Sequence, residues 1–288
     1  MNRCLVLLLR LTAITASLLL ISACSSLEPA PATDPSLKAV VHAVTVDAEL
    51  ITFKASQPDR LIQRKMLSGM APGETLVGID YRVARGELYA MSNQGRLYRL
   101  DPSTGKLAGL KQGKLLAVPP GGVGFDFNPA ADRIRFVAAD GTNLRFHPDT
   151  GALAATDPKL QYAATDPAHG QAPRLGGAAY TYNKRDEKIT TNYAIDLARG
   201  TLVTQGSAEG VSPAISPNTG TLFTVGPLGT GPIDDVAFDI ADVDNSALAA
   251  IPRGGRTGLY VIELRSGHAR NVGTIGQGRP LWGMAIEP

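Results

Sequence analysis

Residues 78–107 read GIDYRVARGELYAMSNQGRLYRLDPSTGKL, and residues 124–153 read GFDFNPAADRIRFVAADGTNLRFHPDTGAL. The two stretches align over 30 positions without a gap, at an offset of 46 residues, and nine positions are identical. A third copy begins at AFDI (residues 237–240) and continues through LYVIE to the Ser-Gly pair at 266–267. Repetition at a fixed period of this length is typical of solenoids, propellers and arrays.

Short β-rich runs make up each copy, separated by Gly, Pro, Asn and Asp, and no segment shows sustained helical periodicity. In the first copy we expect strands over residues 76–82, 87–92 and 96–100, a turn over 101–105, and a fourth strand beyond it. Four antiparallel strands every 46 or so residues match the length of a β-propeller blade.

The number of blades follows from the innermost strands, which are predicted around Asp80, Asp126, residues 179–182, Asp239 and residues 283–286. The sequence stops after the last of them, and about three strands precede the first, over residues 40–47, 50–55 and 60–67. A first blade shared between both ends would remove two exposed sheet edges.

We therefore predict an all-β fold, with residues 39–288 forming one β-propeller of about five four-stranded blades closed by N- and C-terminal strands. Longer loops are expected around residues 160–173 and 206–219. Six blades is the alternative, because residues 206–231 have room for a degenerate one. A β-sandwich of two repeat pairs is a third possibility.

Residues 1–23 have the layout of a secretory signal peptide, with Arg3 and Arg10 around an apolar run that leads into small residues. The next four residues, Ile21-Ser22-Ala23-Cys24, resemble the lipobox of bacterial lipoproteins, whose thiol is acylated and whose chain is cleaved before the Cys. The resemblance implies lipidation of Cys24. An uncleaved membrane helix is the alternative, and Arg10 interrupts it.

Three lipid chains on one Cys give stable membrane anchoring, whereas one chain binds only marginally. Serines follow Cys24 where an Asp typically retains Gram-negative lipoproteins in the inner membrane, so the resemblance implies the outer membrane, facing the periplasm. The Pro-rich residues 24–38 are expected to form the lipidated Cys and an extended tether.

Charge and cysteine content exclude several functions. The leader carries two of the 28 Lys and Arg residues and no acid, so 26 basic and 26 acidic residues remain. A neutral chain gives no broad electrostatic footprint for nucleic acid. Cys4 leaves with the leader and Cys24 is acylated, so the folded domain would lack disulfides, thiolate metal sites and Cys nucleophiles.

Three aligned acids, Asp80, Asp126 and Asp239, are the most distinctive polar feature of the repeats. On innermost strands they would converge on a central channel and bind a cation or a polyhydroxylated ligand. Alternatively, each would hydrogen-bond to backbone groups and hold the ring together, because a buried carboxylate needs partners. Repetition favours the structural role, since a binding site usually breaks symmetry.

Arg99 and Arg145 recur at one position of the repeat and are candidates for a basic, anion-binding face. Residues 60–145 hold 13 basic against 7 acidic residues, whereas residues 148–288 hold 11 against 14. Such a sector would attract anionic glycans. An ordinary solvated surface is the alternative interpretation.

Other patterns carry less information. Residues 242–246 (DVDNS) resemble the start of a calcium loop, but Ala247 stands where Gly is required and Arg253 where a bidentate Glu is required. We interpret them as an Asx-rich turn. No two of the four histidines have metal-ligand spacing, and the common hydrolase, metalloprotease and nucleotide-binding motifs are absent from the sequence.

The stretch GFDFNPAADRIRFVAADGTNLRFHPDTG (residues 124–151), LFTVGPLGT (222–230) and VAFDI (236–240) resemble the bacterial domain-of-unknown-function family 4394. The resemblance covers residues 39–288. It implies a propeller-like fold without an agreed activity, and it supplies no catalytic residue.

The sequence thus favours a lipid-anchored envelope propeller that binds or scaffolds a glycan, peptide or protein without catalysis or a cofactor. The alternative is a metal-dependent envelope hydrolase or lactonase-like enzyme with a divalent cation at the channel carboxylates.

Overall fold

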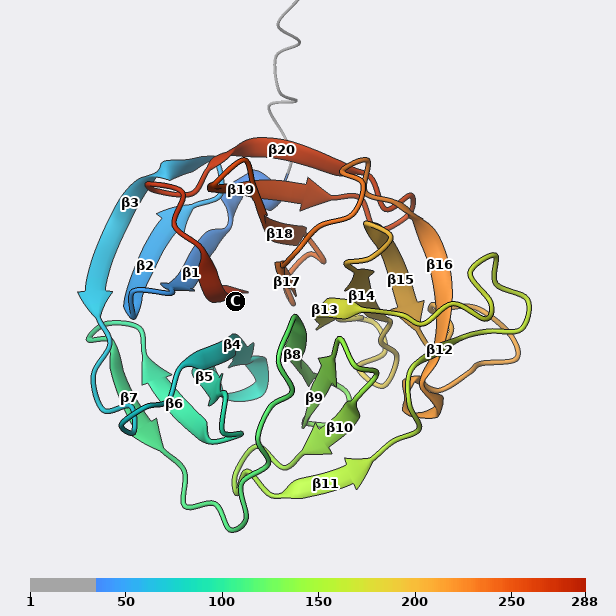
Figure 1. The fold of residues 1–288 in the computed structure, drawn as a ribbon, viewed down its shortest axis with the longest axis horizontal. Helices are drawn as coiled ribbons and strands as arrows, with labels where there is room; N and C mark the ends of the chain where they lie inside the picture. Colours follow the sequence, from blue (N-terminus) through green and yellow to red (C-terminus); the bar gives the residue numbers. More distant parts are fainter. Residues whose placement is uncertain (1–34) are drawn as a thin grey trace, which may run out of the picture. The chain divides into compact units, whose positions relative to one another are not determined.

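The computed structural model describes residues 35–288, which form five β-sheets arranged as blades around a ring (Figure 1). Blade 1 contains β21 (Leu281–Ile286), β1 (Val40–Thr45), β2 (Glu49–Lys54) and β3 (Gln57–Met66), from the inside outwards. Blade 2 contains β4 (Leu76–Arg82), β5 (Glu87–Ser92), β6 (Leu97–Asp101) and β7 (Lys106–Gly109). Blade 3 contains β8 (Val123–Asn128), β9 (Arg133–Ala138), β10 (Asn143–Phe146) and β11 (Leu153–Thr156).

Blade 4 contains β13 (Leu175–Tyr180), β14 (Asn192–Asp196), β15 (Thr201–Gln205), β16 (Thr221–Pro227) and the short β12 (Gln161–Tyr162). Blade 5 contains β17 (Ala237–Ile240), β18 (Ala247–Arg253), β19 (Arg256–Ile262) and β20 (Ala269–Thr274). Short 3-10 helices span Pro35–Lys38, Val83–Arg85 and Pro217–Thr219. The predicted five-bladed propeller is confirmed.

Blade 4 departs from the four-stranded pattern. The predicted loop over 160–173 contributes β12, which pairs in parallel with the outer strand β16, Gln161 opposite Thr221. The stretch 206–231, where a sixth blade was the alternative, instead holds a loop and β16 itself. The six-blade alternative is therefore wrong, because these residues complete blade 4.

Both ends of the described chain meet in blade 1. Strand β21 pairs antiparallel with β1, placing Val41 opposite Ile286 and Ala43 opposite Met284. The predicted sharing of the first blade is confirmed. This pairing closes the ring and covers the inner edge of β1.

Five hydrophobic clusters fill the spaces between blades. Between blades 2 and 3, for example, the Tyr89 ring meets the edge of Phe127 with centroids 5.2 Å apart. Such buried aromatic side chains contribute apolar area and a favourable edge-to-face contact.

The innermost strands approach one another closely at small residues. A Cβ added to Gly124 on β8 would lie 2.6 Å from the backbone nitrogen of Ala178 on β13. A Cβ on Gly283 of β21 would lie 2.8 Å from the backbone nitrogen of Ile79 on β4. Glycine at these positions therefore allows the innermost strands of neighbouring blades to pack closely.

The predicted signal peptide, Cys24 and most of the predicted tether lie outside the described residues. The tether's last residues, Pro35–Lys38, form a 3-10 helix rather than extended chain, with Pro in the first position, where its fixed φ is compatible with helix. Among residues 35–288, no helix has the length and apolar character needed to cross a membrane.

Candidate functional site

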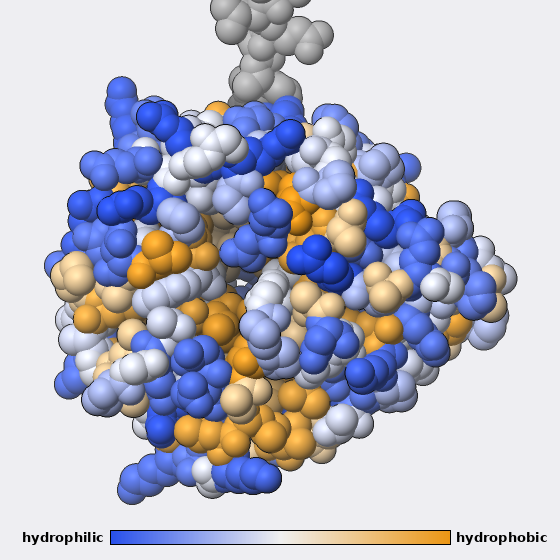
Figure 2. Space-filling model, viewed as in Figure 1, coloured by the Kyte–Doolittle hydropathy of each residue, from blue (hydrophilic) through white to orange (hydrophobic). Residues whose placement is uncertain are grey.

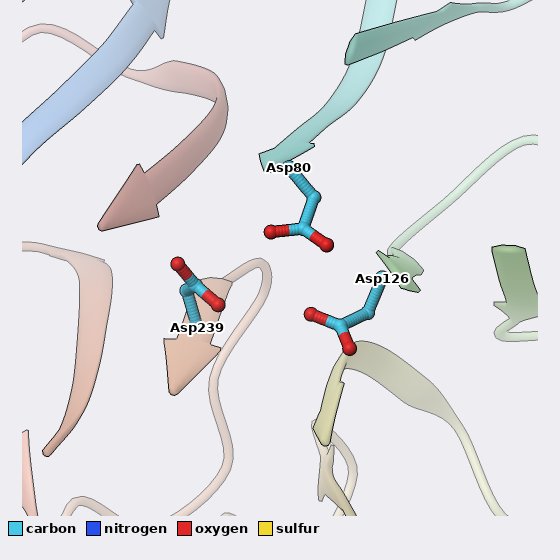
Figure 3. Close-up of side chains that lie close together, drawn as sticks. All are labelled: Asp80, Asp126 and Asp239. Atoms are coloured by element: carbon cyan, nitrogen blue, oxygen red, sulfur yellow. The ribbon is translucent and has the colours of Figure 1, made fainter. Parts of the chain in front are cut away.

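Asp80, Asp126 and Asp239 point toward one another at the centre of the ring (Figure 3). They lie on the innermost strands β4, β8 and β17, and their relative exposure is 7%, 5% and 4%. One oxygen from each lies within 4.8 Å of the others. On the two remaining innermost strands, Ala179 and Ala285 occupy this position.

Each aspartate links its own blade to the next. Its Oδ2 accepts a hydrogen bond from a backbone N–H of the following innermost strand: Phe127 to Asp80 at 2.7 Å, Tyr180 to Asp126 at 2.9 Å, and Ile286 to Asp239 at 2.6 Å. The junctions from blade 4 to 5 and from blade 1 to 2 start at Ala179 and Ala285, which have no carboxylate.

At these two junctions, the N–H that lacks a carboxylate partner from the preceding blade bonds instead to the aspartate before it on its own strand. Asp239 Oδ1 accepts from the N–H of Ile240, and Asp80 Oδ1 accepts from the N–H of Tyr81, both at 2.7 Å. Asp126 needs no such bond, because Asp80 already bonds to Phe127. Within residues 35–288, no donor is bonded to Asp126 Oδ1. Each of the three aspartates therefore bonds to a backbone N–H of the following blade, and Oδ1 of Asp126 is the one cluster oxygen without a donor among these residues.

The charges around the cluster are negative. Burial, and then the carboxylates of Asp239 and Asp242, raise the pKa of Asp80 well above its ordinary value. Burial, and then the other three acids, do the same for Asp126. Burial raises the pKa of Asp239 to about 6, and burial together with Asp239 raises the pKa of Asp242 to about 7.

Buried carboxylates that face one another are neutralised by shared protons or by a bound cation. The atoms that could coordinate a metal here are carboxylate oxygens, which hard cations such as Ca²⁺ and Mg²⁺ prefer. The cluster is thus a candidate cation site as well as a link between blades.

A pocket of about 220 Å³ lies at the mouth of the channel, on the side where the innermost strands end. Its polar lining residues are Tyr81, Arg82, Asn128, Asp132, Tyr182, Glu187 and Asp242. Figure 2 shows the ring face-on, with an opening at its centre bordered by hydrophilic and hydrophobic residues.

Arg82 joins blades 2 and 3 at the mouth through ion pairs. Its side chain is only 3% exposed and forms ion pairs with Asp132, and with Asp149 at 2.6 Å. Both acids belong to blade 3, so this guanidinium fixes the mouth across the junction of blades 2 and 3. Tyr182 on the opposite side donates to Glu187 at 3.0 Å.

The sequence predicted Asp242 only as part of a turn. That turn exists: Asp244 Oδ1 accepts from the N–H of Ser246 at 2.9 Å, and Asn245 bonds to both backbone groups of Tyr182. Asp242, however, lies at the mouth beside the cluster. Its position three residues after Asp239, just beyond the strand, was the available signal.

Arg99 and Arg145, the predicted basic face, occupy corresponding positions on β6 and β10. Arg99 lies 3.6 Å from Glu87 and over the Tyr89 ring. Arg145 makes a bidentate pair with Asp157, at 2.8 and 2.9 Å. Each therefore has an acidic partner, and their joint role as an anion-binding face stays a prediction.

Sequence reasoning missed Arg135 on β9, the largest fully buried side chain of the described residues. It lies between blades 3 and 4 and bonds to Tyr180, Asn143, Asp157 and Asn218.

Comparison with known families matches residues 49–285 to the family described as Domain of unknown function (DUF4394). The chain belongs to this family. The match includes blades 2 to 5 and part of blade 1 of the DUF4394 propeller, and its description names no activity. No curated protein matches the sequence.

Two solved structures are similar to this DUF4394 chain. One is a structural genomics protein of unknown function from Bacteroides thetaiotaomicron VPI-5482, 14% identical, with a TM-score of 0.49 over 87% of this chain and 66% of that chain. The other is in a nidogen/laminin complex, 9% identical, with a TM-score of 0.47 over 87% of this chain and 98% of that chain.

Proposed function

We propose that this DUF4394 protein is a lipid-anchored propeller of the cell envelope that binds a ligand at the mouth of its channel without catalysis. The anchor part of the proposal rests on the sequence Ile21-Ser22-Ala23-Cys24 and on the serines that follow it. These residues favour the outer membrane, facing the periplasm. The partner is an envelope protein, peptide or glycan.

A Cys24→Ala variant tests the anchor. It is expected to lose incorporation of labelled fatty acid and to leave the membrane fraction after a salt wash, whereas Cys4→Ala keeps both properties because Cys4 lies in the leader. A Cys24→Ala chain that stays in the washed membrane fraction would contradict lipid anchoring.

One observation carries the binding role: the mouth pocket combines rigid polar walls with an acidic floor. Arg82 and its two acidic partners hold one wall, and the Tyr182–Glu187 pair lies in the other. Asp242 and the three channel carboxylates lie at and below the mouth. Such a site selects a cationic or polyhydroxylated group, because those groups satisfy carboxylates and tyrosine hydroxyls together.

Binding of amino sugars and neutral oligosaccharides to the purified full-length chain in detergent tests this role. The Asp242→Asn variant, which keeps the shape of the pocket, is expected to weaken binding of an amino sugar about tenfold. Asp244→Asn, two residues away in the same turn and outside the pocket lining, is the matched control. Equal affinity of Asp242→Asn and the native chain would contradict the role of the mouth.

A metal-dependent hydrolase or lactonase-like enzyme is the second candidate, and the convergence of three buried carboxylates favours it. Elemental analysis of the chain purified without chelator, with melting temperatures across divalent cations, separates the candidates. A stoichiometric metal that is lost in Asp126→Asn, with the fold intact, supports the enzyme. A metal-free chain whose melting temperature does not respond to cations supports the binding propeller.

A further inference from the structure

A second hollow, of about 690 Å³, lies between blades 3 and 4. The β8–β9 turn, the β13–β14 loop and the β15–β16 loop supply most of its lining. It lies on the same end of the ring as the channel mouth, and the two hollows share Asn128. Its volume falls within the range of small-molecule sites, about 300–1,000 Å³.

Arg135 forms part of the lining, and its guanidinium is a donor only. Its Nε donates to the hydroxyl of Tyr180 at 3.1 Å, and its Nη2 donates to Oδ1 of Asn218 at 2.5 Å. Its Nη1 donates to Asn143 at 2.8 Å and to Asp157 at 2.6 Å. The guanidinium therefore uses acceptor atoms of two other residues that line the cleft, Tyr180 and Asn218.

The same hydroxyl of Tyr180 and the same amide group of Asn218 each also carry a hydrogen-bond donor. Since Oδ1 of Asn218 faces Arg135, its Nδ2 amide group points away from the guanidinium, and the hydroxyl hydrogen of Tyr180 is likewise unused by this bond. Among residues 35–288, no acceptor is bonded to Asn218 Nδ2 or to the Tyr180 hydroxyl hydrogen. Tyr180 is only 2% exposed, so its hydroxyl is a buried donor without an acceptor.

The cleft is also rich in positive charge, which favours the same kind of ligand as these donors, an anion. Asp157, whose side chain is 6% exposed, is shared by Arg135 and Arg145, so one carboxylate faces two guanidinium groups. Arg133 and Lys188 also line the cleft, and the Arg133 guanidinium donates to backbone carbonyls. Glu209 is the one acid among the lining residues, and Asn183 donates to its carboxylate.

We propose that this cleft binds the oxyanion group, phosphate or carboxylate, of a small molecule. Tyr180, Asn218 and Arg145 would donate to the anion, and Lys188 would add charge at the rim. The apolar side chains of Ile189 and Val211, 39% and 52% exposed, would contact the uncharged part of the ligand. The proposal does not depend on the channel mouth, which is proposed to take cationic or polyhydroxylated groups.

Binding of phenyl phosphate and benzoate to the purified full-length chain in detergent, measured by calorimetry, tests the proposal, because neither probe has the polyhydroxylated group assigned to the channel mouth. Benzyl alcohol is the uncharged control. One or both anions are expected to bind saturably while benzyl alcohol does not, and the stronger of the two identifies the group as tetrahedral or planar. Absence of binding by both anions, or equal binding of benzyl alcohol, would overturn the proposal.

The Asn218→Asp variant tests whether the anion binds in this cleft. It keeps the oxygen that accepts from Arg135 and replaces the amide donor with a second acceptor, so it is expected to fold and to bind the anion at least about tenfold more weakly. Arg64→Ala, on the outer strand of blade 1, changes the net charge by the same amount and is expected to keep native affinity. Native affinity in Asn218→Asp would refute the site.

Arg145→Gln provides a second test should Asn218→Asp fail to fold, because Arg145 is 29% exposed and Asp157 retains Arg135. The Arg145→Gln variant is also expected to bind the anion about tenfold more weakly. Asp242→Asn at the channel mouth should leave anion affinity unchanged. Failure of the mouth proposal and failure of the cleft proposal are therefore distinguishable.

Discussion

The carboxylate of Asp126 accepts a hydrogen bond from the backbone N–H of Tyr180, 2.9 Å away, and so joins blade 3 to blade 4 in the wall of the channel. Its other oxygen has no donor among residues 35–288, and burial, followed by the neighbouring carboxylates, raises its pKa well above the ordinary value. The residue thus combines a favourable hydrogen bond with the cost of burying an acidic group, and substitutions can separate the two.

Asp126→Asn keeps an oxygen that accepts from Tyr180 and removes the charge, whereas Asp126→Ala also removes the acceptor. We expect Asn to be more stable than Ala by about 1–3 kcal/mol, the cost of a buried donor without an acceptor. Urea denaturation at constant pH measures the difference. The same pair of substitutions at exposed Asp59 is the control and should differ little. Equal stability of the two Asp126 variants would show that this bond contributes nothing.

The channel carboxylates predict a dependence of stability on pH. Folding raises the pKa of Asp239 to about 6 and that of Asp242 to about 7, and it also raises those of Asp80 and Asp126. An acid with a raised pKa binds its proton more tightly in the folded state. Its contribution to the free energy of unfolding therefore falls as pH rises from about 4 through the folded pKa.

Melting temperatures in chelator are expected to be lower at about pH 8 than at about pH 5.5. His42 acts in the opposite direction, because burial lowers its pKa. The Asp242→Asn variant isolates the acid's contribution and should flatten the fall between about pH 6 and pH 8. A stability that rises throughout this range in the native chain would contradict raised pKa values in the channel.

Repetition made the fold predictable. The 46-residue offset placed Asp80 and Asp126 at one position of neighbouring blades, and the position of the last strand implied that both ends share a blade, as the pairing of Val41 with Ile286 confirms. Strand β12 was not predictable, because its two residues, Gln161 and Tyr162, have no period and depend on pairing with β16.

The site was predictable only where it repeats. Arg135 aligns with Tyr89 of the preceding copy, so a charge replaces an aromatic residue on a buried strand, and this substitution was a readable signal. Its partners Asp157 and Asn218 lie in stretches that do not repeat, 22 and 83 residues away. Only the folded ring brings them together.

The close approach of the innermost strands predicts a strong effect of one methyl group. Gly124→Ala would place its Cβ 2.6 Å from the backbone nitrogen of Ala178, which cannot move without shifting β13. We expect a loss of about 1–3 kcal/mol in the free energy of unfolding. Gly113→Ala is the matched control, since no atom lies within 4 Å of its added Cβ. A loss in the control equal to that of Gly124→Ala would mean that close approach is not the cause.

The ion pair of Arg135 with Asp157 predicts a non-additive pair of substitutions. Arg135→Leu removes the guanidinium and leaves Asp157, only 6% exposed, with Arg145 as its remaining basic partner. Because breaking a buried pair leaves an under-compensated charge, we expect a loss of about 3–5 kcal/mol in the free energy of unfolding.

Replacing Asp157 with Leu as well removes that charge, and Arg145, 29% exposed, remains hydrated. The double variant should therefore be more stable than Arg135→Leu alone, although it has lost more native groups. Arg145→Leu is the control and should cost less, because Asp157 keeps the bond to Arg135 at 2.6 Å. Urea denaturation of these three variants and of Asp157→Leu alone measures the coupling between Arg135 and Asp157. A double variant that loses the sum of both single effects would show that the two residues contribute independently.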